Sequence, residues 1–113
     1  MGGCEEIRAI AAQEGRPNLE IWVTEFGEST CDDPELFCVS EPEQAAKLVA
    51  SLRELGNAYP YVPVAIIYEA RDEPDAPGPA RQAHFGLFRA AGAGEEPTPK
   101  PAVAAIRKLY LGN

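Results

Sequence analysis

Residues 19–26 read LEIWVTEF, and this stretch decides the fold. Its β-branched and aromatic side chains, followed by Gly27, predict a strand. A second strand is predicted at residues 62–69, VPVAIIYE, where an almost continuous apolar run is typical of a strand covered on both faces. If a helix fills the interval, the crossover makes the two strands parallel neighbours in one sheet.

Three helices are expected around these strands. The clearest start is the capping box SEPE at residues 40–43, with proline in the first turn and Gly56 as the expected stop. Another helix is predicted from about Cys4 to Gln13, and a closing helix follows Pro101. Residues 71–101 hold six of the eleven prolines and are predicted to form a long polar loop. The order helix, strand, helix, strand, helix places the chain in the α/β class.

Two parallel strands do not make a stable sheet by themselves. Their outer edges would leave backbone groups unpaired, and both strands are predicted to be buried on each face. A chain of 113 residues normally folds as one domain around its own core. The strand pattern instead predicts that residues 1–113 are a single partial domain, one piece of a larger sheet.

Composition narrows the classes of partner. The chain is 45% hydrophobic and 25% charged with a mean hydropathy of -0.24, and no apolar run approaches the roughly 18 residues of a membrane span. Its formal charge of -8, with ten unclustered Lys and Arg residues, would repel phosphate backbones and anionic headgroups. We therefore expect neither a nucleic acid nor a membrane as partner.

The three cysteines leave the redox compartment open. Cys31 and Cys38 bracket a six-residue loop that a disulfide would close in an oxidising compartment, and both stay free thiols in a reducing one. Their spacing matches no zinc site and His84, the single histidine, lies far away in sequence, so no metal site is expected. The residues after Met1 lack the basic start and apolar core of a secretory signal, so no export signal is expected.

The motifs at the strand ends resemble those of a known superfamily. Residues 21–27, IWVTEFG, resemble the seventh strand of the glycoside hydrolase (β/α)8 barrels that include cellulase-like and xylosidase-like enzymes. Residues 67–72, IYEARD, look like the eighth strand and its exit, residues 85–88, FGLF, like the Phe-Gly-Leu that follows, and residues 99–102, PKPA, like the start of the last helix. The resemblance covers almost the whole chain but only two of the family's eight strand-helix units. It implies a partial TIM barrel made of strands 7 and 8.

By this resemblance Glu25 is the catalytic nucleophile of a retaining glycosidase, a hydrolase of O-glycosyl bonds. Strand alternation supports the assignment, because it puts Glu25 at the carboxyl end of one row of side chains, where barrel enzymes carry their catalytic groups. The row taken to face inward is Ile21, Val23 and Glu25, and the row taken to face the helices is Trp22, Thr24 and Phe26.

A retaining glycosidase also needs a protonated carboxyl group roughly 5 to 5.5 Å from the nucleophile. In the family this group belongs to an Asn-Glu-Pro motif on the fourth strand, which the chain does not contain. The triplet DEP at residues 72–74 is similar in letters, but it follows the nucleophile and is predicted to lie in a loop, so we treat it as a decoy. The isolated chain is therefore expected to be inactive.

Two further residues are candidates for substrate binding. Glu69 shares a predicted face with Ile67 and would point into the barrel mouth, with an ordinary loop-end charge as the alternative. Tyr68 is the other candidate, with packing between sheet and helix as its alternative, and the same packing is expected of Trp22. Ile67 is placed where the family tends to carry a sugar-stacking tryptophan, which predicts weakened sugar binding.

The resemblance implies a carbohydrate substrate, an extracellular location and no cofactor. It also implies a partner, either the missing amino-terminal portion of the barrel or a second copy of the chain. Two other functions remain open: a carbohydrate-binding remnant without chemistry, and a small α/β module that pairs its strand edges with a partner.

Overall fold

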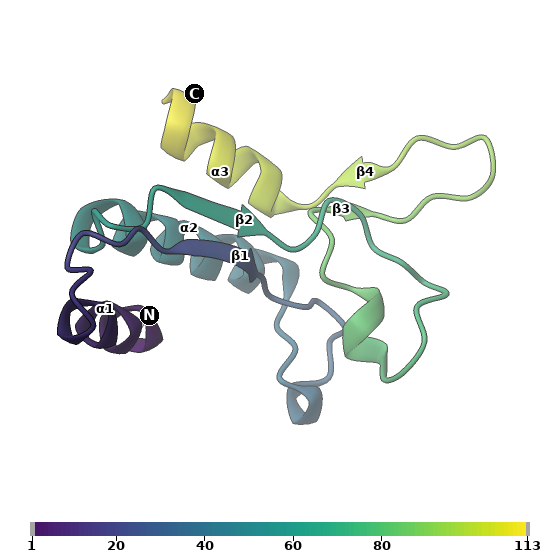
Figure 1. The fold of residues 1–113 in the computed structure, drawn as a ribbon. Coiled ribbons are helices and arrows are strands. Elements are labelled where there is room, and N and C mark those ends of the chain that lie inside the picture. Colours follow the sequence, from purple (N-terminus) through teal and green to yellow (C-terminus); the bar gives the residue numbers. More distant parts are fainter. Residues whose placement is uncertain (1, 113) are drawn as a thin grey trace.

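A computed structural model describes residues 2–112 as a mixed α/β arrangement (Figure 1). The predicted order of elements is confirmed over these residues. The five predicted elements are α1 (Gly2–Gln13), β1 (Trp22–Phe26), α2 (Glu41–Ala58), β2 (Val64–Ile67) and α3 (Pro101–Leu111). Helix α2 begins at the predicted capping box, where Ser40 and Glu43 bond each other's backbone N–H groups. Its expected stop is wrong, because α2 runs through Gly56 to Ala58.

Strands β1 and β2 pair in parallel, as predicted. Trp22 lies opposite Val64 and Val23 opposite Ala65, but the next pair is Phe26 with Ile67. Between the last two pairs β1 advances by three residues and β2 by two. The extra residue in β1 forms a bulge. The expectation of two strictly alternating rows along β1 is therefore wrong.

Helices α2 and α3 cover one face of the sheet. In Figure 1, α2 runs behind the two strands and α3 crosses above them. The core cluster consists of Ala45, Leu48 and Ala102, and Phe26 and Ile67 pack against it from the sheet. Because residues paired across two strands point to the same side, Val23 and Ala65 also belong to the face turned toward the helices.

The other face of the sheet, which we call the open face, carries exposed apolar side chains. Trp22 is 60% exposed and Ile66 50% exposed, so the expectation that Trp22 packs between sheet and helix is wrong. The bulge is the physical reason, because it puts Trp22 on the opposite side of β1 from Phe26. Glu25, the neighbour of Phe26, is exposed and also lies away from the helices, as expected.

Ile67 does not lie on the open face. It packs against the helices α2 and α3, so it does not stand beside Glu25 in the place of a sugar-stacking residue. The residue that follows β2, Tyr68, instead lines a pocket together with Glu25.

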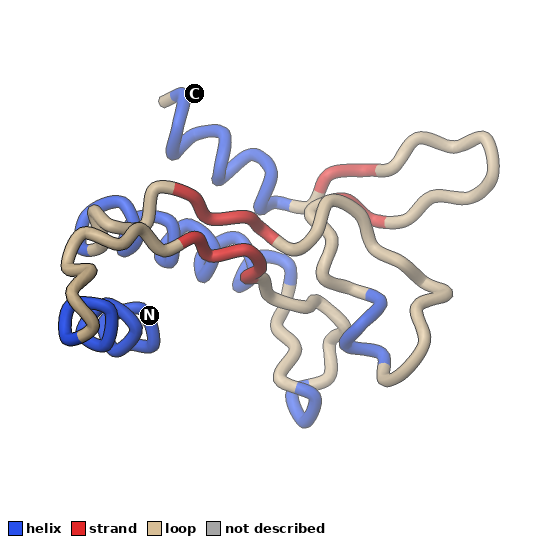
Figure 2. The backbone as a smooth tube through the Cα atoms, in the orientation of Figure 1, coloured by secondary structure: helices blue, strands red, loops and turns tan. Residues whose placement is uncertain are grey.

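The predicted loop at residues 71–101 is long but not structureless. It contains the 3₁₀ helix η2 (Ala80–Ala83) and a short antiparallel pair, β3 (Phe88–Arg89) with β4 (Thr98–Pro99). A further 3₁₀ helix, η1 (Pro34–Leu36), lies in the loop after β1. Figure 2 shows that both loops extend beyond the carboxyl ends of β1 and β2. They supply the surroundings of the candidate site.

The chain exposes more surface than a complete domain of its mass. Its accessible surface is 7424 Å², whereas a monomer of 12.2 kDa exposes roughly 6,100 Å². Its radius of gyration is 16.3 Å, compared with about 13 Å for a compact domain of this length. The excess of about 1,300 Å² is larger than the roughly 800 Å² that each partner contributes to a standard protein interface.

Candidate functional site

A pocket of about 320 Å³ lies at the carboxyl ends of the two parallel strands. One side is formed by the end of β1 and the other by the segments that follow β2. Its lining residues are Glu25, Phe26, Gly27, Tyr68, Gln82 and Phe85. The structure thus brings together Glu25 and Tyr68, two of the three residues singled out in the sequence. We call this the site pocket.

Backbone contacts at the end of β1 hold the site pocket together. The Tyr68 N–H donates to the Phe26 carbonyl at 2.7 Å, and the Glu69 N–H donates to the Phe85 carbonyl at 3.2 Å. Gly27 packs so closely on this turn that a Cβ atom built there would lie 2.0 Å from the Tyr68 carbonyl oxygen. Glycine is therefore required at this position.

Tyr68 and Phe85 form an aromatic wall beside Glu25. Their ring centroids are 5.6 Å apart in an edge-to-face arrangement. The negative charge of Glu69, together with burial and the charges of Glu73 and Glu25, raises the pKa of Tyr68, so its phenol stays protonated and can donate a hydrogen bond. Tyr68 lines the site pocket and contacts Phe85, in the position expected of a substrate-binding candidate.

Glu69 lies outside the lining of the site pocket. Burial raises the pKa of its carboxyl group, and the charges of Glu73 and Asp72 raise it further, while the nearby Tyr68 phenol acts in the opposite direction. Its buried Oε1 has no hydrogen-bond partner among the described residues. The carboxyl group of Glu69 is therefore influenced by the acidic residues of the following loop, and it does not share the site pocket with Glu25.

Asp72 has a structural role that the sequence did not predict. Its side chain is buried, and Oδ1 lies 2.7 Å from Nζ of Lys100, which is 1% exposed. The same Oδ1 accepts the backbone N–H of Gly86 at 2.8 Å. Asp72 thus anchors the triplet at residues 72–74 to Lys100 and to the backbone of Gly86.

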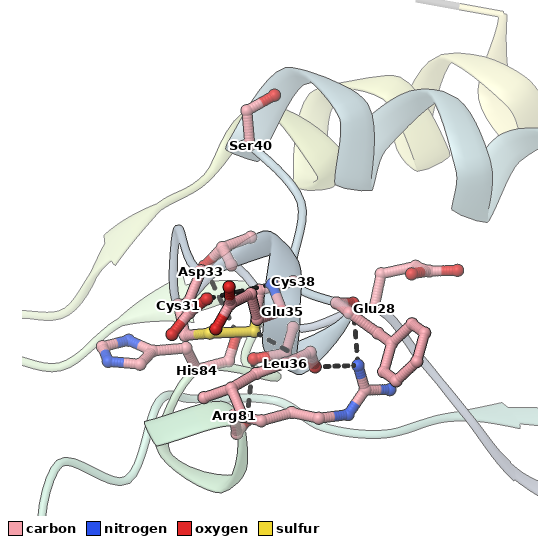
Figure 3. The surroundings of a disulfide bond; sticks show 12 residues. Glu28, Cys31, Asp33, Glu35, Leu36, Cys38, Ser40, Arg81 and His84 are labelled. Atoms are coloured by element: carbon pink, nitrogen blue, oxygen red, sulfur yellow. Dashed lines mark hydrogen bonds between the residues drawn. A yellow bond between two sulfur atoms is a disulfide. The ribbon is translucent and has the colours of Figure 1, made fainter. Parts of the chain in front are cut away.

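A disulfide joins Cys31 and Cys38, with their Cα atoms 5.5 Å apart. It closes the segment at residues 31–38, which we call the disulfide loop. Figure 3 shows Arg81 of η2 reaching toward Leu36 of this loop. The disulfide loop therefore touches the segment that supplies Gln82 and Phe85 to the site pocket.

Gln82 and Phe85 are site residues that the sequence analysis missed. The motif FGLF at residues 85–88 was noticed for its resemblance, but no periodicity connects it with Glu25. Only the turn after β2, closed by the Glu69–Phe85 backbone bond, brings Phe85 to the end of β1.

Residues 2–112 hold neither a metal site nor a membrane-spanning helix. No cluster of three or more His, Cys, Asp or Glu side chains suited to a metal ion occurs there. Within the same range, no helix has both the length and the apolar character needed to cross a bilayer.

No protein-family model, curated protein or solved structure matches this chain. The chemistry of the site pocket therefore rests on its own side chains. They combine an exposed carboxylate, a phenol, an amide and an aromatic ring edge. Such a set suits a polar ligand that also has a hydrocarbon face.

Proposed function

We propose that this chain is the carboxyl-terminal portion of a retaining glycoside hydrolase barrel, which acts on O-glycosidic bonds once further parallel strands complete the sheet. The observation that carries the proposal is the position of Glu25. It lies at the carboxyl end of a parallel strand, on the side away from the helices, and shares a pocket with Tyr68 and Phe85. Barrel enzymes hold their catalytic residues at this end of their strands.

In the proposed reaction the Glu25 carboxylate attacks the anomeric carbon of the sugar. A protonated carboxyl group on an added strand gives its proton to the leaving oxygen as the glycosidic bond breaks. The same group then takes a proton from water, which attacks the anomeric carbon and releases Glu25. Among the described residues lining the site pocket, Glu25 is the one carboxylate, so the proposal assigns the second to an added strand.

We assign sugar contact to Tyr68 and Phe85. An aromatic side chain packs against the C–H face of a sugar, and the protonated Tyr68 phenol supplies a hydrogen-bond donor. The expectation of weakened sugar binding rested on Ile67, but the aromatic wall stands at the pocket without it. Glu69 does not line the pocket. Its role in sugar binding is indirect, because its negative charge raises the pKa of Tyr68 and so keeps the phenol protonated.

The proposed partner is a polypeptide that continues the parallel sheet on both sides. Strands β1 and β2 pair with one another, which leaves each with an outer edge free among the described residues. The open face between these edges carries Trp22 and Ile66. Strands added at the two edges would pair the backbone groups and bury this apolar surface in the interior of a barrel.

The experiment is a chimera in which six strand-helix units of a retaining barrel glycosidase precede residues 2–112. It should hydrolyse an aryl glycoside and accumulate a glycosyl-enzyme adduct detectable by mass spectrometry on the peptide that contains Glu25. Glu25→Gln should abolish both signals, whereas Glu20→Gln, which changes an exposed carboxylate in the segment before β1, should leave them unchanged. A Glu25→Gln chimera as active as its parent would overturn the assignment, and sugar binding without turnover would indicate a binding remnant.

The open face also favours a second candidate, a small α/β module that associates with a partner through its strand edges. This function needs no chemistry at Glu25. The chimera distinguishes the two, because only a glycosidase portion should give hydrolysis that depends on Glu25. Light scattering tests the association that both functions require. A monomer that unfolds cooperatively would count against both readings.

A further inference from the structure

The side chain of Arg81 connects two parts of the loop region. Its guanidinium Nη1 donates to the carbonyl oxygens of Leu36 at 3.0 Å and Phe37 at 2.8 Å, both in the disulfide loop. Figure 3 shows this contact beside the Cys31–Cys38 bond. Two acceptors on consecutive residues fix the direction of the guanidinium more tightly than one would.

The same guanidinium group lies over the ring of Phe85, with the central carbon 5.0 Å from the ring centroid. The ring of Phe85 in turn meets Tyr68 edge to face. A continuous series of contacts therefore runs from the disulfide loop through Arg81 to the aromatic wall of the site pocket.

Both the backbone of Arg81 and the carbonyl groups that its guanidinium contacts are held in place. The backbone of Arg81 is held because its carbonyl accepts a hydrogen bond at 2.7 Å from Ser29 Oγ, a fully buried side chain. The carbonyl groups of Leu36 and Phe37 are held because the disulfide closes their loop and Cys38 is buried. Opening the disulfide would release a segment that now has few conformations, and the acceptors of Arg81 would move with it.

We propose that Arg81 is a positioning residue, which transmits the closed state of the disulfide loop to the Tyr68–Phe85 wall and so sets the affinity of the site pocket for a sugar. The sugar part of this inference rests on the proposed function. The coupling between the loop and the rings does not, because it is a property of the chain without ligand. Arg81 touches no reacting atom, and its effect on the pocket is carried by Phe85.

The coupling is tested on the full chain without ligand, by the NMR ring signals of selectively labelled Tyr68 and Phe85. Arg81→Gln should shift both signals, and so should the paired substitution of Cys31→Ser and Cys38→Ser. Arg107→Gln, which changes an exposed arginine on α3, is the matched control and should shift neither. In the paired serine background Arg81→Gln should cause little further shift, because the acceptors of the guanidinium are already released.

Reduction of the unsubstituted chain guards against a folding defect in the variants. A dithiol in excess cleaves the Cys31–Cys38 bond by supplying two electrons and becomes a cyclic disulfide itself. It should produce the same ring shifts, and reoxidation should reverse them. Ring signals that stay in place after reduction, while the thiols are shown to be free, would overturn the coupling. Full additivity of Arg81→Gln with the paired serine substitutions would overturn it too.

Sugar binding is measured separately, in the chimera, by titration with methyl β-glucoside and methyl β-xyloside. Reduction should weaken binding severalfold. If the ring signals respond to the disulfide but neither glycoside binds the oxidised chimera, the coupling stands and the proposed glycosidase function fails. If glycosides bind equally well before and after reduction, the effect on affinity is refuted while the proposed function survives.

Discussion

Lys100 Nζ lies 2.7 Å from Asp72 Oδ1, and both side chains are buried. The same ammonium group donates to Thr30 Oγ1 at 2.9 Å and to the His84 carbonyl at 3.3 Å. Lys100 immediately precedes α3, Asp72 follows β2, and Thr30 follows β1. One ammonium group therefore joins the segments that follow β1 and β2 to the start of α3.

Removing one partner of this ion pair should destabilise the fold strongly. Lys100→Met leaves a buried carboxylate without its counter-charge, and Asp72→Asn leaves a buried ammonium in the same condition. Each should lower the free energy of unfolding by about 3 to 5 kcal/mol, measured by urea denaturation. Lys108→Met, an exposed lysine on the same helix, should change it by less than about 0.5 kcal/mol. Equal effects at positions 100 and 108 would refute the structural role.

The disulfide should stabilise the fold by constraining the unfolded chain. Its two cysteines are seven positions apart, and closing a loop of this size is worth roughly 2 to 3 kcal/mol. We expect Cys31→Ser with Cys38→Ser to lower the unfolding free energy by about this amount. Cys4→Ser, which changes the free cysteine of α1, is the control and should have little effect. A protein whose stability is insensitive to a dithiol would contradict the prediction.

Two glycines at the site leave no room for a methyl group. A Cβ at Gly27 would lie 2.0 Å from the Tyr68 carbonyl oxygen, and a Cβ at Gly86 would lie 2.1 Å from the Asp72 nitrogen. Gly27→Ala and Gly86→Ala should each cost at least about 1 to 3 kcal/mol, because the contacts are with backbone atoms. Gly56→Ala, inside α2 with nothing within 4 Å, should stabilise the fold by about 0.5 to 1 kcal/mol. Denaturation midpoints would show these opposite signs.

Glu69 should make stability depend on pH in a defined direction. Burial, followed by the charges of Glu73 and Asp72, raises the pKa of Glu69 in the folded chain above the value of 4.5 for an unperturbed Glu. Its stabilising contribution is thus complete below the unfolded pKa and is lost as pH rises through the raised pKa. Glu69→Gln should therefore be more stable than the parent at neutral pH, with the gain disappearing below about pH 4. A gain that is independent of pH, in melts compared with the exposed Glu20→Gln control, would contradict this.

The parts of the fold that sequence predicted are those with a local signal. The capping box at Ser40 predicted the start of α2, and the apolar run ending at Ile67 predicted β2. The helical crossover between the two strands predicted that β1 and β2 are parallel. Glu25 was placed on the correct side of the sheet even though the rows along β1 were wrong. Glu25 still lies on the expected side because it is the direct neighbour of Phe26, and adjacent strand residues point to opposite faces.

The parts that were missed depend on contacts distant in sequence. The bulge in β1 has no signature in residues 19–26, and without it Trp22 was assigned to the helix side. The burial of Lys100 depends on Asp72, which is 28 positions away. Phe85 reaches Tyr68 only because the intervening polar loop folds back on the strand end.

Trp22 should report directly on whatever covers the open face. It is the single tryptophan of the chain and is 60% exposed, so its fluorescence is an unambiguous probe of this surface. If other strands or a second copy pack there, emission should move to shorter wavelengths and acrylamide quenching should weaken as the concentration of chain or partner rises. Ile66→Lys puts a charge on the same face and should prevent these changes, since a buried unpaired ammonium is costly. The control Ala46→Lys, on the exposed side of α2, should leave them intact. If Trp22 emission stayed constant while sedimentation showed a larger species, the contact would lie elsewhere on the molecule.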